Sequence, residues 1–273
     1  MKKNREDIRN GIRKNYAEVA NNTSAGGCCG GGCCCCGAPV DIQASTKKLG
    51  YAEEDLINIP KDANMGLGCG NPIAIAALKA GETVLDLGCG GGFDCFLASK
   101  RVGESGAVIG VDMTPDMITL ARKNAEEGGY TNVDFRLGEI EHLPVADGSV
   151  DVIISNCVIN LSLDKEQVFK ETNRVLKPGG RLSISDVVAT ERIPEKMRLD
   201  LQLVACCIGG AEHVDDLRTM LKNAGFDDIR LTPKENSEEI IKSWGFGNNI
   251  EDYVASYMIE AYKNAKSIKI QEA

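Results

Sequence analysis

Short apolar runs alternate with longer segments of helical period from Pro72 to about residue 190. Runs of about four to eight residues rich in Val, Ile and Leu are typical of buried strands, and an apolar spacing near 3.6 is typical of helices. The pattern predicts strands at 83–88, 107–113, 132–138, 150–156 and 181–188 and helices at 72–81, 91–103, 114–129 and 164–176. Strands that alternate with helices in this way predict an α/β domain with a mostly parallel sheet, covered by helices on both faces.

The ends of these predicted helices carry residues suited to helix termini. Pro72 stands in the first turn of its helix, and Gly81 follows the predicted end. Thr114 precedes Pro115 and is expected to be the N-cap of the third helix. The motif KPGG, which no helix can continue through, is expected to close the fourth helix.

The N-terminal part of the chain follows other patterns. Residues 3–21 carry apolar side chains at helical spacing and predict a helix. The Gly/Cys tract that follows cannot bury apolar surface, so we expect residues 22–38 to be a poorly ordered loop in the absence of a ligand. Residues 51–71 are rich in turn formers and are expected to lead into the domain without long regular elements.

The C-terminal part is expected to be richer in helix. Apolar spacing predicts helices at 195–211, 214–225 and 249–265, and a late strand at 226–233. We expect this part to add the last strands of the sheet and a small α-rich lobe that covers the active site of the domain. The chain is therefore divided into the N-terminal segment 1–71, the core 72–190 and the C-terminal lobe 191–273.

Charge and cysteine content narrow the class of protein. The net charge is −9, so the basic surface of a nucleic-acid-binding protein is absent. The sequence contains no apolar run long enough to span a membrane, and the charged N-terminus has no signal-peptide core, so we expect a cytoplasmic protein. Twelve cysteines in a reducing compartment indicate metal binding or thiol chemistry rather than disulfides. Nothing indicates a coiled coil, and a monomer is expected.

A glycine turn follows the first strand of the core. The segment VLDLGCGGG places Asp86, Gly88 and Gly90 between a strand and a helix, where glycines allow the backbone to approach a ligand closely. The next strand ends in Asp112, an acid suited to accepting two ribose hydroxyls. A NAD-binding domain is the alternative, but the motif G-x-G-x-x-G does not follow the first strand.

The segments VLDLGCGGG, GVDMTPDM, LGEIEHLP and VLKPGGRLSISD occur in this order and resemble the class I S-adenosylmethionine methyltransferases of Rossmann-like fold over about residues 72–190. The resemblance implies that the Gly88 turn wraps the methionine part of S-adenosylmethionine and that Asp112 binds its ribose. It further implies that Met113 packs on the adenine. The cofactor-binding residues implied by this resemblance are Asp86, Gly88, Cys89, Gly90, Asp112, Met113, Glu139, Ile140 and Asn156.

The cysteines fall into groups with different interpretations. Cys89 and Cys95 flank the cofactor turn and are most simply buried small hydrophobes. Cys157 lies just past the end of a parallel strand, where open α/β sheets hold ligands. Cys69 and Cys207 each stand near glycines, which suits a thiol presented from a turn. Whether these thiols converge on one site or are unrelated and buried is left open by their spacing alone.

The segments GLGCGNP, SNCVINLSLDK and CCIGGA resemble those of the arsenite methyltransferases. The resemblance implies that Cys69, Cys157 and Cys207 bind trivalent arsenic, with Cys206 as the less certain neighbour. It also implies a role in the first methylation for one further cysteine, which we cannot choose among the six at Cys28, Cys29, Cys33, Cys34, Cys35 and Cys36.

This resemblance implies a reaction in which S-adenosylmethionine methylates arsenite held by soft thiolates, for arsenic detoxification. The arsenic lone pair carries no proton, so no general base is needed, and orientation supplies the catalysis. A thiol reductant, thioredoxin or glutathione, is the implied partner. Two alternatives stay open: a methyltransferase for a small organic substrate such as a quinone, and a thiol protein that holds zinc in the cysteine-rich loop. His213 is a weaker candidate for the substrate pocket, and His142 is expected to lie in a turn.

Overall fold

The structure is a computed structural model that describes residues 5–21, 42–57, 59–198, 200, 203–204, 206–244 and 249–265. The helices before the fourth strand are α1 (Arg5–Asn21), α2 (Ile42–Lys48), α3 (Glu53–Leu56), η1 (Lys61–Ala63), α4 (Pro72–Ala76), α5 (Phe93–Val102) and α6 (Pro115–Gly128). The later helices are η2 (Ile159–Leu161), α7 (Lys165–Val175), α8 (Glu195–Arg198), α10 (Val214–Asn223), α11 (Ser237–Ser243) and η3 (Ile250–Asp252).

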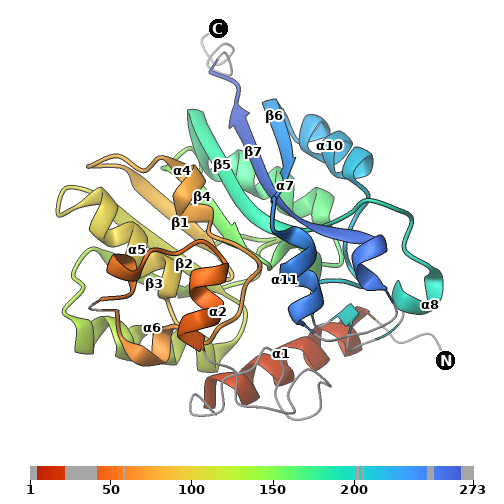
Figure 1. The fold of residues 1–273 in the computed structure, drawn as a ribbon. Coiled ribbons are helices and arrows are strands. Elements are labelled where there is room, and N and C mark those ends of the chain that lie inside the picture. The colour runs from red at the N-terminus through yellow and green to blue at the C-terminus, as the bar shows by residue number, and fades with distance from the viewer. Residues whose placement is uncertain are drawn as a thin grey trace, which may run out of the picture.

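Seven strands form one sheet, which is drawn at the centre of Figure 1 with helices on both sides. The strands are β1 (Thr83–Leu87), β2 (Ala107–Asp112), β3 (Val133–Leu137), β4 (Val150–Asn156), β5 (Leu176–Ala189), β6 (Phe226–Pro233) and β7 (Val254–Lys263). Their order across the sheet is β3-β2-β1-β4-β5-β7-β6. The first five strands pair in parallel, and β7 is antiparallel to both of its neighbours. The expectation of a mostly parallel sheet is therefore confirmed.

The two faces of the sheet bury separate apolar clusters. Leu85 and Leu87 of β1 belong to the cluster that includes residues of α7 and α10. Val84 of the same strand belongs to the cluster that includes residues of α4, α5 and α6. Because successive strand residues point to opposite faces, this division is the layered arrangement that the β-α alternation predicts.

Three helix predictions are wrong in extent or in kind. The segment 249–265 is expected to be helical, but it contains the strand β7, which lies between β5 and β6. The segment 195–211 is not one helix, since α8 ends at Arg198 and residues 206–210 form turns. The helix that begins at Pro72 ends at Ala76 and does not reach Gly81, because Ala77 adopts a left-handed conformation with φ 46°.

The KPGG motif ends α7 as expected, but it belongs to the long strand β5 rather than to a separate turn. Thr114 is the N-cap of α6, as expected, although its side chain makes no hydrogen bond to the helix. Asp164 caps α7 more fully, because its carboxylate accepts a hydrogen bond from the Gln167 amide at 3.1 Å.

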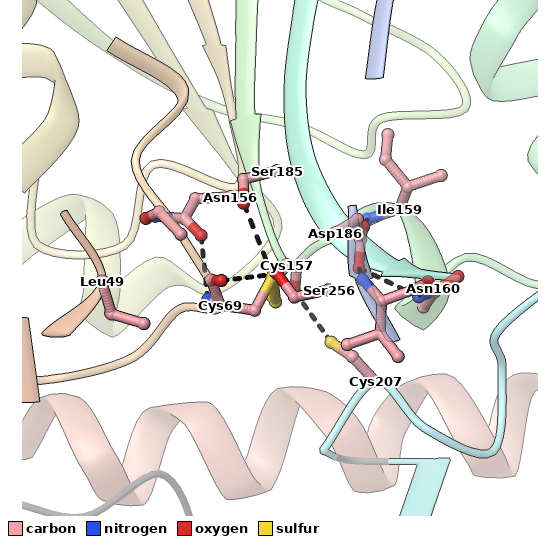
Figure 2. Close-up of a disulfide and its surroundings, with 12 residues drawn as sticks. Leu49, Cys69, Asn156, Cys157, Ile159, Asn160, Ser185, Asp186, Cys207 and Ser256 are labelled. Atoms are coloured by element: carbon pink, nitrogen blue, oxygen red, sulfur yellow. Dashed lines mark hydrogen bonds between the residues drawn. A yellow bond between two sulfur atoms is a disulfide. The ribbon is translucent and has the colours of Figure 1, made fainter. Parts of the chain in front are cut away.

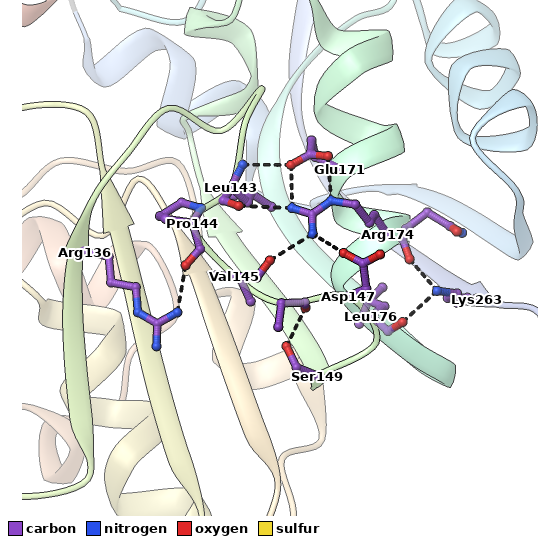
Figure 3. Close-up of polar contacts among 12 residues, drawn as sticks. Arg136, Leu143, Pro144, Val145, Asp147, Ser149, Glu171, Arg174, Leu176 and Lys263 are labelled. Atoms are coloured by element: carbon purple, nitrogen blue, oxygen red, sulfur yellow. Dashed lines mark hydrogen bonds and ion pairs between the residues drawn. The ribbon is translucent and has the colours of Figure 1, made fainter.

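Arg174 near the end of α7 holds the segment that follows β3 (Figure 3). Its guanidinium donates to the carbonyls of Leu143 at 3.0 Å and Val145 at 2.9 Å. Glu171 completes the contact, since its carboxylate accepts from the Leu143 amide at 2.8 Å and from Arg174 at 2.7 Å. These bonds fix the segment at Leu143 and Val145 against α7.

Helix α1 lies across the lower edge of the fold in Figure 1, against α6 and near α11. Its buried residues are Ile12, Val19 and Ala20, so the helical pattern expected from the sequence is the face that packs on the molecule. Among the described residues, no helix is long and apolar enough to cross a membrane.

Candidate active site

A cavity of about 300 Å³ lies at the end of the sheet where β1, β2 and β4 finish. It is lined by residues of the glycine turn, of the ends of β2 and β4, and of the turn that carries Cys206 and Cys207. Arg9 of α1 and Trp244, which directly follows α11, are among the residues that complete its wall. Open parallel sheets hold ligands at the carboxyl ends of their strands, and a cavity of this size suits a small ligand.

The glycine turn after β1 forms one wall of the cavity. Gly88 has a φ of 68°, and a Cβ there would lie 2.4 Å from a methyl carbon of Val158. The Gly88 amide donates to the carbonyl of Val111 at 2.8 Å, and the Gly90 amide donates to the carboxylate of Asp112 at 3.0 Å. The turn is therefore held against β2, and a residue larger than glycine cannot replace Gly88 without a shift.

Asp112 ends β2 beside this turn. One carboxylate oxygen accepts from Gly90 and the other accepts from the Thr114 amide at 2.8 Å, so the side chain points back along the cavity wall. Burial raises the pKa of Asp112 above its ordinary value, while these amides act in the opposite direction. Met113 lines the cavity next to it.

A buried polar network lies beneath the glycine turn, and the sequence interpretation missed two of its members. The Tyr51 hydroxyl donates to Asp94 at 2.7 Å, and the Asn156 amide group donates to the other Asp94 oxygen at 3.2 Å. Asp86 lies nearby and accepts from the Cys95 thiol at 3.2 Å. The only sequence signal for Asp94 is an acid within the otherwise apolar start of α5, and Tyr51 has none.

Burial dominates the electrostatics of this network. Loss of hydration raises the pKa of Asp94 to about 6 and raises the pKa of Asp86 well above its usual value. Among the described residues, no Lys or Arg forms a hydrogen bond or ion pair with either carboxylate. Both acids line the cavity, so a cationic group of a ligand would find them unneutralised.

Glu139 does not line the cavity. It lies between Arg9 at 3.3 Å and Arg13 at 2.5 Å, both on α1, and so it fastens that helix to the segment after β3. Its neighbour Ile140 is 9% exposed and lines the cavity, as does Glu141. The structure thus brings Ile140 to the expected cofactor site and gives Glu139 a contact with α1 instead.

Cys69 and Cys157 are joined by a disulfide (Figure 2). Cys157 follows β4 directly and has a φ of 56°, while Cys69 lies in the segment before α4 and is fully buried. The Cys69 amide donates to the Asn156 side chain at 3.2 Å, which places the two segments side by side. The sequence interpretation expected thiols at these positions, and the structure shows them paired with one another.

Cys207 lies beside this pair, with its thiol 2.8 Å from the carbonyl of Cys157 (Figure 2). It has a φ of 64° within a turn, and Cys206 precedes it on the cavity wall. The following Gly210 packs directly on η2, because a Cβ there would lie 2.0 Å from the carbonyl oxygen of Asn160. The three cysteines implied by the resemblance are therefore close neighbours, although they come from three separate parts of the chain.

A buried carboxylate lies close to the two paired cysteines. The ligand atoms of Cys69, Cys157 and Asp186 lie within 4.8 Å of one another. Asp186 is 2% exposed, and burial raises its pKa to about 7 in spite of the amides that bond to it. The sequence interpretation did not select this residue, which stands near the carboxyl end of β5.

The remaining candidates lie apart from the paired cysteines and Cys207. Cys89 lines the cavity with little exposed area, and burial raises the pKa of its thiol to about 11. Cys95 is fully buried in the core, as expected.

His213 does not line the cavity and stands as the N-cap of α10. His142 lies in a tight turn, where it bridges to Glu139. The six cysteines at 28–36, and the expected loop at 22–38, lie outside the described residues.

A seven-stranded sheet of this order, with a glycine turn after β1 and an acid at the end of β2, defines a methyltransferase domain. In agreement, the sequence model of the family described as "Methyltransferase domain" matches residues 78–225.

Comparison with individual proteins narrows the family. The arsenite methyltransferase of Halobacterium salinarum is 52% identical over 223 residues, which cover 82% of this chain and 57% of that protein. The arsenite methyltransferase of Homo sapiens is 39% identical over 191 residues, which cover 66% of this chain and 50% of that protein. The chain spans about half the length of these curated relatives.

A solved structure extends the likeness to the fold. The crystal structure of an arsenic(III) S-adenosylmethionine methyltransferase from Chlamydomonas reinhardtii matches with a TM-score of 0.61 and 34% identity. The match covers 86% of this chain and 76% of that one. The chain therefore belongs to the arsenite methyltransferase family.

Proposed function

We propose that this protein transfers the methyl group of S-adenosylmethionine to trivalent arsenic held by Cys69, Cys157 and Cys207. The observation that carries the proposal is the position of these residues. They come from three chain segments: Cys157 and Cys207 line the cavity that the glycine turn also lines, and Cys69 is buried next to them, joined to Cys157. Thiolates are soft ligands and favour soft ions, which suits arsenic in its trivalent state.

The described residues fit S-adenosylmethionine. The close-fitting turn at Gly88 and Gly90 would hold the methionine part, and Asp112 would accept the ribose hydroxyls. Met113 and Ile140 would pack against the adenine. The buried carboxylates of Asp86 and Asp94 offer negative charge to the cationic cofactor, whose sulfonium supplies the methyl group when bound.

The thiols must be reduced before they hold arsenic. Three thiols condense with arsenite, so that three As–S bonds form and three water molecules leave. The pyramidal product keeps a lone pair on arsenic. As this pair forms a bond to a methyl group placed in line with it, the methyl–sulfur bond would break and its electron pair would stay on the departing S-adenosylhomocysteine. The protein contributes chiefly by fixing these atoms in one orientation.

The Cys69–Cys157 disulfide is the oxidised form of two of these ligands, so a thiol reductant, thioredoxin or glutathione, is the partner that this function requires. Reduced thiols persist in the cytoplasm, and we propose that location for the reaction. We further propose that the protein acts as a monomer, which light scattering of the reduced protein would test.

The experiment is to measure methylated arsenic by chromatography with mass detection after incubation with S-adenosylmethionine, thiol reductant and arsenite. We expect Cys69→Ser, Cys157→Ser and Cys207→Ser each to lower turnover as far as the triple substitution does, because residues that act as a unit are strongly non-additive. The affinity for S-adenosylmethionine should stay near that of the wild type.

Two other cysteines provide matched controls. Cys206→Ser tests the choice between neighbours and should retain activity, and Cys95→Ser should affect mainly stability because its thiol lies in the core. Normal turnover in Cys157→Ser would rule out the three-thiol site and would favour a small organic substrate such as a quinone.

A further inference from the structure

Asp186 is a buried carboxylate near the carboxyl end of β5 that has no part in the chemistry described above. Three N–H groups point at it. One oxygen accepts from the side chain of Asn160 at 2.9 Å and from the amide of Val187 at 2.7 Å. The other oxygen accepts from the amide of Ile159 at 3.1 Å. A carboxylate is the one side chain of this shape that can accept from all three donors.

The short segment 157–160 is held at both ends by two successive residues of β5, Ser185 and Asp186. The segment 157–160 leaves β4 at Cys157, whose amide donates to the carbonyl of Ser185 at 2.9 Å. Ile159 and Asn160 then bind the carboxylate of Asp186, the next residue along β5. Cys157 therefore stands between two anchors, and its left-handed backbone conformation is imposed from both sides.

The same segment also positions Cys207. Its thiol donates to the carbonyl of Cys157, and the turn that follows it packs on the carbonyl of Asn160 through Gly210. Figure 2 shows Asp186, Asn160 and Ile159 on one side of Cys157, with Cys207 beside it. A shift of the segment would consequently displace two of the three sulfur atoms together.

From these contacts we propose that Asp186 is a positioning residue for arsenic binding, which sets where Cys157 and Cys207 stand relative to Cys69. This inference rests on the proposed function. The backbone of Cys69 is held separately, because its amide donates to Asn156 of β4. Asp186 therefore decides whether the sulfur atoms of Cys69, Cys157 and Cys207 can all reach the same arsenic atom.

The test is Asp186→Asn, which keeps the shape but places an NH₂ group against an N–H donor. To observe the inner thiols alone, the loop cysteines are replaced by Ser in every protein compared, namely Cys28, Cys29, Cys33, Cys34, Cys35 and Cys36. Each protein is reduced and given less than one equivalent of arsenite, and X-ray absorption at the arsenic edge counts the sulfur neighbours. The arsenite dissociation constant is measured in parallel.

We expect three sulfur neighbours in the parent protein and two, with one oxygen, in Asp186→Asn. The dissociation constant for arsenite should rise about 10- to 100-fold, the range found when groups that orient metal ligands are removed. The dissociation constant for S-adenosylmethionine should change less than about twofold, because Asp186 does not line the cofactor cavity. Asn160→Ala, which removes one of the three donors, should shift coordination in the same direction by less.

Glu171→Gln is the matched control. Its carboxylate also accepts a backbone amide, from Leu143 (Figure 3), but Glu171 does not line the cavity, so the substitution should cost stability and leave three sulfur neighbours. Three sulfur neighbours and an unchanged arsenite dissociation constant in Asp186→Asn would overturn this inference. If the parent protein itself lacks three sulfur neighbours, the proposed function fails, and this inference fails with it.

Discussion

Asp112 shows how far single residues can be interpreted from sequence. Its place at the end of a strand was enough to predict an acid beside the glycine turn, because parallel strands bring their carboxyl ends to one edge. That its two oxygens already bind the amides of Gly90 and Thr114 could not be predicted, since these bonds depend on the exact approach of two loops. Tyr51 and Asp94 were missed for the same reason: their importance arises from contact with Asn156, which is distant in sequence.

Replacing Asp112 tests the ribose assignment. Asp112→Ala should weaken binding of S-adenosylmethionine by about 1.5–3 kcal/mol, the scale of hydrogen bonds to a charged group. Calorimetric titration measures the change, and Asp134→Ala, an exposed acid on β3, serves as the control. Equal affinity in Asp112→Ala and the wild type would rule out the assignment.

Asp94 should make stability depend on pH in a direction that its burial fixes. Because its pKa is raised to about 6 in the folded protein, the folded state holds this proton more tightly than the unfolded state does. Its contribution to the free energy of unfolding therefore falls as pH rises from about 4 to about 6 and is constant above that, with a total change of up to about 3 kcal/mol. Denaturant unfolding of the wild type and of Asp94→Asn at a series of pH values should show this difference in slope. Parallel curves for the two proteins would contradict it.

Among the elements, β7 shows why some assignments from pattern fail. Residues 254–263 have apolar residues at spacings that also fit a helix, although β7 is a strand with a neighbour on each side, next to the edge strand β6. Its pairing with β5 and β6, which decides the outcome, is not a local property. The turn at 206–210 is a similar case, because Gly209 and Gly210 permit close packing that apolar spacing does not indicate.

Helix α1 depends on a contact that can be removed selectively. Glu139→Gln should loosen α1, because Glu139 pairs with both Arg9 and Arg13, although these partly exposed pairs are worth only about 0.2–1 kcal/mol each. In low salt, hydrogen exchange of the α1 amides should be faster in Glu139→Gln than in the wild type. The difference between the two proteins should be smaller in high salt, where the ion pairs are screened. Glu126→Gln, an exposed acid on α6, is the control. Unchanged exchange in α1 would show that its apolar face alone holds it.

At the scale of the whole molecule, the cofactor wall and the thiols are joined through Asn156. Its carbonyl oxygen accepts from the amide of Cys69, and its NH₂ group donates to Gly70 on the same side and to Asp94 on the cofactor side. Gly70 is tightly fitted there, because a Cβ would lie 1.9 Å from the hydroxyl oxygen of Ser185. One side chain thus touches both halves of the proposed reaction, and a ligand that orders one half should order the other.

This arrangement predicts coupling between the two ligands. In the wild type, S-adenosylmethionine should lower the dissociation constant for arsenite, and by thermodynamic reciprocity arsenite should lower that of S-adenosylmethionine by the same factor, about 5-fold or more. Asn156→Ala should bring this factor close to one, because it removes the contacts with both the Cys69 segment and Asp94. Calorimetric titration of each ligand with and without the other measures the factor directly. Asn173→Ala is the control, because it loses a bond to the carbonyl of Gly225, which does not line the cavity, and it should keep the wild-type coupling factor. The full wild-type coupling factor in Asn156→Ala would show that the two ligand sites communicate by another route.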